Sequence, residues 1–292
     1  MQLKDSQISG FKKFLYRKGM LTATTDCYVR DVGAFMQWIS KSRGHFGFEG
    51  NVDVELYLKH LAENQKDSKN SIRRKLISLK QFFRFLYHEE LSQSSPVDEI
   101  PIPARDESLP NTLEPLQIDS LIKATSKSTT KFKALRDRAI FSLFAFEGLK
   151  AAEITALKWS DFLMTSGKVG SLKIIGQKAR VINLTPDVTD AISSYKNHIS
   201  ACYAETISRN IAMFTGIMGR SGLPAEKPIS RHGIKFMLYD LGNTQKIDKL
   251  NTELLRHYAI NFHLELGKSP EDVMEHFGLR QLGNVGKHAR QI

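Results

Sequence analysis

The chain has 292 residues, 41% of them hydrophobic, which is enough for two ordinary domains with cores of their own and excludes a fibrous or disordered protein. Lysine and arginine outnumber aspartate and glutamate by 42 to 31, and the net charge of +11 favours a polyanionic partner, either nucleic acid or an anionic membrane surface. No apolar run approaches the roughly 18 to 20 residues that span a bilayer, and the start lacks the apolar core of a signal peptide, so we expect a cytoplasmic protein.

Residues 1–95 are predicted to form a bundle of four to five helices, because apolar residues recur at helical spacing from position 8 to position 91. One of these helices, SIRRKLISLKQFFRFLY at residues 71–87, has an apolar side and a basic remainder. Its basic residues are Arg73, Arg74, Lys75, Lys80 and Arg84. Such a helix can dock its apolar side and offer its cations to phosphates, and the alternative is an ordinary solvated surface.

Residues 96–113 are predicted to be an interdomain linker, because proline disfavours helix there and favours extended backbone. Residues 114–292 are predicted to be a second domain. Its helical segments are residues 114–123, 135–146, 188–203, 229–241, 252–266 and 270–277, with a short helix beginning near Ala151 after Gly148. Residues 172–184 contain two β-branched runs around a tight basic turn, which predicts an antiparallel hairpin. The predicted fold class is therefore mainly α, with one small antiparallel β-sheet.

The cysteines and histidines give no sign of a metal or redox site. Cys27 and Cys202 are far apart and have no partner at a metal-ligand spacing, so we expect both to be core thiols. The histidines form no metal-like cluster in the sequence, and the chain has neither a Walker-type loop nor a dinucleotide fingerprint. We therefore expect no metal and no cofactor.

Five segments form a distinctive set in this order along the chain. They are TATTDCYVRDVGAFMQWI from Thr22, SIRRKLISLKQFFRFLY, ESLPNTLEPLQIDSLI at residues 107–122, GLKAAEITALKWSDF at residues 148–162, and LLRHYAINFHLELGKSPEDVMEHFGL at residues 254–279. Together they resemble the tyrosine recombinase (phage integrase) family, of the Xer-like type, over most of the chain. The resemblance implies a helical core-binding (SAM-like) domain, a linker, and a domain of the catalytic type, which together close around duplex DNA.

The resemblance also assigns roles to particular positions. In the family, two arginines grip the scissile phosphate, a hairpin lysine is the general acid, two histidine-type positions donate hydrogen bonds, and a tyrosine hydroxyl attacks phosphorus. The first arginine position is Lys150 here, the hairpin lysine is Lys178, and the second arginine is Arg256. These three residues and Arg180 are the DNA contacts that the resemblance implies in the second domain.

Four positions depart from the family's pattern. Lys150 is a point charge that cannot reproduce the planar, bidentate grip of a guanidinium on two phosphate oxygens. Glu253 stands at the first histidine position, Leu279 at the later histidine or tryptophan position, and His288 at the nucleophile position. No tyrosine follows Tyr258, so a small shift in the alignment restores no nucleophile. The resemblance thus implies a disabled cleavage site.

Glu253 is the most damaging of these departures. A carboxylate about 4 Å from a phosphate is repelled by roughly 1 kcal/mol in water and about 4 kcal/mol at an effective dielectric near 20. We expect Glu253 to repel phosphate in this way, or to pair with Arg256 or Lys150 and compete with phosphate for these cations.

The main functional hypothesis is a DNA-binding protein of this family without independent strand cleavage, which acts in recombination or integration, either alone or beside an active recombinase. One alternative is an active, divergent recombinase that uses His288 as nucleophile or is completed in trans. Tyr258 and His257 are expected to be packing residues instead. Another alternative is a non-DNA scaffold.

Only four residues follow His288, so the helix that family members exchange between protomers is expected to be absent or very short. We accordingly expect the protein to be a monomer when it is not bound to DNA and to lie in the nucleoid region. Whether it forms oligomers on DNA is left open.

Overall fold

The computed structural model describes residues 5–43, 51–92, 95, 97–104, 112–164, 169–176, 178–204, 212–219, 221–282 and 285. The chain divides into two compact units, Met1–Ser108 and Leu109–Ile292, each of which is described by itself. Position 288, the family's nucleophile position, lies outside the described residues. Among the helices described, none combines the length and the apolar character needed to cross a membrane.

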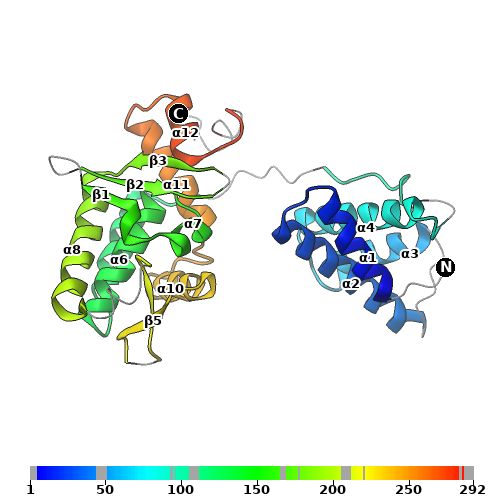
Figure 1. The fold of residues 1–292 in the computed structure, drawn as a ribbon, viewed down its shortest axis with the longest axis horizontal. Helices are drawn as coiled ribbons and strands as arrows, with labels where there is room; N and C mark the ends of the chain where they lie inside the picture. Colours follow the sequence, from blue (N-terminus) through cyan, green and yellow to red (C-terminus); the bar gives the residue numbers. More distant parts are fainter. Residues whose placement is uncertain are drawn as a thin grey trace. The chain divides into compact units, whose positions relative to one another are not determined.

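The first unit is a helical bundle, as predicted (Figure 1). Its described helices are α1 (Asp5–Arg17), α2 (Thr22–Arg43), α3 (Asn51–Glu63) and α4 (Lys69–His88). The side chain of Ser68 caps α4 by accepting a hydrogen bond from the Ser71 backbone N–H at 3.2 Å. The apolar side of α4 is fully buried because its residues recur every three or four positions. They include Leu76, Leu79, Phe83 and Leu86.

The core of the first unit extends past its last helix. Val97 and Ile100 are buried against the apolar residues of the bundle. Both lie in the segment predicted to be a linker, so part of that segment packs on the first unit instead of bridging freely. Their apolar side chains explain the difference, because burying them is favourable wherever a neighbouring core offers space.

The second unit combines helices with two small sheets (Figure 1). Its helices are α5 (Pro115–Thr125), α6 (Lys131–Ala145), α7 (Ala151–Ala156), the 3-10 turn η1 (Trp159–Asp161), α8 (Pro186–Cys202), α10 (Arg231–Thr244), α11 (Thr252–Glu265) and α12 (Pro270–Phe277). Its strands are β1 (Phe162–Met164), β2 (Gly170–Ile174), β3 (Arg180–Asn183), β4 (Thr215–Ile217) and β5 (Pro224–Pro228). The predicted helices of this domain are confirmed to within a few residues at their ends.

The predicted hairpin is confirmed as β2 and β3, which pair antiparallel with Leu172 opposite Ile182. The sequence prediction missed β1, which adds the third strand in the order β1-β2-β3, and the separate pair of β4 and β5. These strands are short, and β5 has the sequence PAEKP, whose prolines and charges are unfavourable in strands. Tertiary packing therefore overrides local propensity here.

The prediction that both cysteines are core thiols is wrong for Cys202, which is exposed, while Cys27 is half-buried. Cys202 is the last residue of α8, beyond Ile199, the last buried position of that helix. Cys27 lies beside Arg74, whose Nη1 is 2.9 Å from its Sγ.

Candidate nucleic-acid interface

The positions that the family uses for chemistry gather at one pocket of about 570 Å³ in the second unit. Its lining includes the end of β2, the hairpin turn, the start of α11 and the residues after α12. The lining residues are Lys150, Ala152, Glu153, Ile175, Gly176, Lys178, Glu253, Arg256, Gly278, Leu279 and Arg280. Every family position named from the sequence and described in the structure is therefore in this pocket.

Lys150 precedes α7 as its N-cap residue. The carboxylate of Glu153 accepts a hydrogen bond from the Lys150 backbone N–H at 2.8 Å, which fixes the first turn of the helix. The Lys150 side chain is left exposed at the pocket, and among the described residues its ammonium makes no ion pair. Lys150 can thus offer a full positive charge to an anion.

Arg256 is buried in α11 and is held by backbone carbonyls. Its Nη1 donates to the Gly148 oxygen, and its Nη2 donates to the Phe277 oxygen at 2.6 Å. Burial lowers the pKa of Arg256, while the carboxylates of Glu153 and Glu253 partly oppose that shift. The guanidinium keeps its charge because the ordinary arginine pKa lies far above neutrality. Arg256 is therefore a fixed cation at the pocket wall.

Arg180 was predicted to contact DNA, but the structure places it in an internal network. Its Nη1 lies 2.9 Å from the Glu153 carboxylate, and its Nε donates to the His276 backbone oxygen at 2.7 Å. Only 7% of its side chain is exposed. Burial alone would raise the pKa of Glu153, but Arg180 and the Lys150 N–H outweigh it and lower that pKa. Arg180 thus orients the pocket's framework, and its predicted DNA contact stays a prediction.

Glu253 does not form either of the ion pairs expected from the sequence. Among the described residues, neither Arg256 nor Lys150 lies within ion-pair distance of its carboxylate. Its backbone N–H donates to the Asn251 side chain at 2.9 Å, as part of the α11 N-cap. The reason is local: Arg256 points inward to its two carbonyls, whereas Glu253 is exposed at the first turn. Its charge is consequently free to act on any anion in the pocket.

The remaining lining positions differ in what they offer. Lys178 is exposed in the hairpin turn, and Leu279 is half-buried and packs on a small core that includes Phe277. Arg280 is exposed and lines the pocket, yet the sequence analysis did not single it out. Its position directly after Leu279 was the available signal, because a basic residue next to a family site position shares its surface.

His257 and Tyr258 were expected to be packing residues. Tyr258 is buried and stacks on Phe262, with ring centroids 6.2 Å apart, which confirms that expectation for the tyrosine. His257 is half-buried, and burial lowers its pKa.

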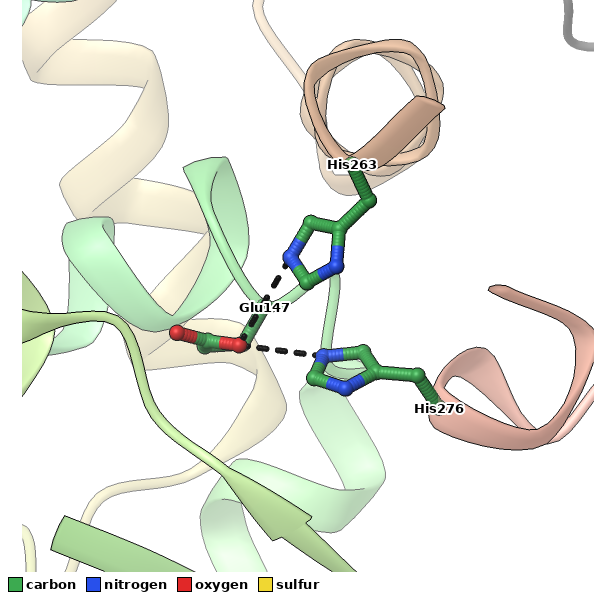
Figure 2. Close-up of side chains that lie close together, drawn as sticks. All are labelled: Glu147, His263 and His276. Carbon is green, nitrogen blue, oxygen red and sulfur yellow. Dashed lines mark ion pairs between the residues drawn. The ribbon is translucent and has the colours of Figure 1, made fainter. Parts of the chain in front are cut away.

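Behind the pocket, the structure brings together three residues that the sequence analysis did not connect: Glu147, His263 and His276. They come from the loop after α6, from α11 and from α12, and their polar ends converge (Figure 2). One donor atom of each lies within 4.8 Å of the others. The prediction that the histidines form no metal-like cluster therefore holds for sequence spacing but not in space.

Comparisons with known proteins agree with this architecture. The sequence model described as the phage integrase N-terminal SAM-like domain matches residues 8–93. The model of the phage integrase family matches residues 111–290, more than half of the chain. The chain belongs to the phage integrase family. The fold class predicted from the sequence, a SAM-like core-binding bundle followed by a catalytic-type domain, is thereby confirmed.

Individual relatives are similar over most of the chain. Tyrosine recombinase XerD of Halalkalibacterium halodurans is 29% identical over 283 residues, covering 95% of this chain and 90% of that protein. XerD of Lacticaseibacillus casei is 30% identical over 184 residues, covering 61% of this chain and 59% of that protein. The solved structure of XerH bound to palindromic difH covers 90% of this chain and 75% of its own, with a TM-score of 0.69 and 16% identity. At that identity the likeness establishes the fold.

In the core-binding unit of this integrase-family chain, several of the predicted DNA contacts are used internally. Lys80 is buried on the same side of α4 as Leu76 and Phe83, and its Nζ donates to the Asp98 backbone oxygen at 3.0 Å. Helical spacing places Lys80 on the apolar side, where its ammonium is engaged within the fold, and the predicted DNA contact stays a prediction.

The other basic residues of α4 are paired with carboxylates or partly buried. Arg74 pairs with Asp31, and Lys75 lies 2.7 Å from the Asp67 carboxylate. Arg73 is half-buried. Arg84 has 55% of its side chain exposed, with its Nε 3.6 Å from Asp98. Of the five, Arg84 is the residue best placed to offer a cation to solvent.

Proposed function

We propose that this chain binds duplex DNA through the cationic pocket of its integrase domain, acts in site-specific recombination or integration, and has no independent strand-cleavage activity. One observation carries the proposal: the same pocket retains the cations that hold phosphate and replaces the groups that activate it. Lys150, Lys178, Arg256 and Arg280 supply positive charge there. Binding needs such charge, whereas cleavage also needs donors and a nucleophile in fixed geometry.

The replaced groups support the absence of cleavage. The carboxylate of Glu253 accepts hydrogen bonds and repels phosphate where the family has a donor, and Leu279 has no polar atom. Losing one preorganised stabilising group typically costs about 100- to 1000-fold in rate. Such losses do not simply multiply, but a site that lacks several roles retains little of the chemistry.

The proposal is tested with nicked suicide duplexes. The target site is first selected from random duplexes by retention on the protein, and a nick is then introduced near its centre. We expect salt-sensitive binding and no covalent adduct on denaturing gels. XerH with its difH site, which has been captured after cleavage, is the positive control. An adduct that disappears in His288→Ala would show an active enzyme with an unusual nucleophile, and binding independent of salt would favour a scaffold.

Replacing Glu253 by glutamine is expected to strengthen DNA binding by at least about 5-fold at low salt, because it removes a repulsion worth roughly 1 kcal/mol at 4 Å in water. The gain should shrink as salt screens the charge. The matched control is Glu271→Gln, an exposed carboxylate in the first turn of α12 that does not line the pocket. Fluorescence anisotropy at several salt concentrations measures both. Equal gains in affinity for the two variants would mean that the effect comes from the protein's net charge and not from the position of Glu253.

A further inference from the structure

The side chains of Glu147, His263 and His276 form a compact polar cluster inside the second unit (Figure 2). Glu147 and His263 are fully buried, and the His276 side chain is 9% exposed. One oxygen of Glu147 is occupied: its Oε1 accepts from the Thr185 backbone N–H at 2.7 Å and from the Thr185 hydroxyl at 3.0 Å. Its Oε2 faces the two imidazole rings.

Two of the atoms that face one another in this cluster form a close ion pair, but without hydrogen-bond geometry. Glu147 Oε2 lies 3.0 Å from His276 Nε2 and 3.8 Å from His263 Nε2. Neither Oε2 nor His276 Nε2 makes an aligned hydrogen bond, and His263 Nδ1 is also buried without one. Buried polar atoms without partners are rare, because each leaves its desolvation penalty uncompensated. All three atoms belong to one cluster, and a group that satisfies them together would remove this penalty.

We propose that Glu147, His263 and His276 bind one divalent transition-metal ion of the zinc type as a structural site. Two imidazoles and one carboxylate are a known zinc ligand set. A cation placed among the three donors would accept a lone pair from each of them and would neutralise the buried carboxylate.

The protonation state of His263 suits a ligand. Burial and the neighbouring His276 lower the pKa of His263 to about 4, so its ring is neutral near pH 7, as metal binding requires. Its Nε2 lies 2.7 Å from the Phe146 backbone oxygen, so this nitrogen can donate there while Nδ1 offers its lone pair. Metal-binding histidines commonly have such a carbonyl contact on the second nitrogen.

The cluster also joins three elements, two of which supply backbone carbonyls that hold arginines of the second unit. Glu147 precedes Gly148, whose carbonyl holds Arg256, and the His276 carbonyl holds Arg180. The next residue, Phe277, supplies the second carbonyl for Arg256. A metal that fastens α11, α12 and the loop after α6 would therefore fix the backbone on which both arginines rest. This inference does not depend on whether the chain cleaves DNA.

The test uses the full chain without a histidine tag, purified, loaded with Zn²⁺ and dialysed against metal-free buffer. Elemental analysis is expected to find about one zinc per chain, and Co²⁺ in its place should give visible ligand-field absorption. The double variant His263→Leu, His276→Leu should lose both signals. The matched control is His198→Leu, His232→Leu, which removes two histidines of the same unit outside the cluster and should retain them.

Thermal unfolding of the unmodified chain gives a second readout that needs no variant. Zinc at about 100 times its dissociation constant should raise the Tm by roughly 5–10 °C, and a chelator should reverse the rise. The proposal is overturned if the unmodified chain retains no metal and its Tm does not change with zinc, in which case the cluster is a buried polar contact without a metal. It is equally overturned if a folded double-leucine variant keeps the metal, because the ion then binds elsewhere.

Discussion

Replacing Gly148 by alanine is expected to destabilise the second unit by roughly 2–5 kcal/mol. Gly148 has φ +56°, a left-handed conformation that costs an alanine about 1–2 kcal/mol. A Cβ there would lie 2.2 Å from Cε1 of Phe277 and 3.2 Å from Cβ of Ala259, so the packed ring must move, which costs about 1–3 kcal/mol more. Thermal or urea unfolding measures the loss.

Gly267→Ala is the matched control for this prediction. Gly267 lies in the same unit and also has a left-handed backbone, with φ +80°, but a Cβ there meets nothing within 4 Å. It should cost only the conformational part, about 1–2 kcal/mol. If the two variants lose the same stability, the contact between Gly148 and the Phe277 ring has no energetic weight.

Arg256→Ala is expected to lower both the stability of the second unit and its affinity for DNA. The carbonyls of Gly148 and Phe277 lose their donor, and each unsatisfied carbonyl costs about 1–3 kcal/mol. Because water entering the space can satisfy part of this loss, we expect on the order of 2–4 kcal/mol in unfolding. If Arg256 also holds one phosphate, as proposed above, the slope of log affinity against log salt should fall by about 1.

Two further variants separate these effects. Arg256→Lys keeps the charge but has no planar fork to reach both carbonyls. Its stability should therefore still fall, whereas its DNA affinity should fall less than that of Arg256→Ala. Arg231→Ala removes an exposed arginine at the start of α10, away from the pocket, and should change stability little. If Arg256→Ala left the salt slope unchanged, Arg256 would be a purely structural residue, and the phosphate contact would have to be made by other pocket cations.

The elements with strong local signals were predictable from the sequence. The α4 stripe of apolar residues determined a buried helix face, and the helical periodicity at residues 270–277 corresponds to α12. The β-branched runs around a basic turn determined the β2–β3 hairpin. The strands β4 and β5 escaped prediction because three to five residues are too few to show a periodic pattern, and β5 also contains prolines and charges.

Residue types and their order along the chain also determined which family this chain belongs to, and which side chains stand at Lys150, Glu253 and Leu279. Only the tertiary structure decided how the charges are used. It buried Lys80, turned Arg180 toward Glu153, and left Glu253 without the ion pair to Arg256 or Lys150 that the sequence suggested.

The cluster of Glu147, His263 and His276 depended on the fold in the same way. The physical reason is that charge and hydrogen-bonding capacity belong to a residue, whereas the partner that satisfies them is chosen by distance in space. Helices α11 and α12 and the loop after α6 are separate in sequence, and only their packing brings two imidazoles and a carboxylate to one point.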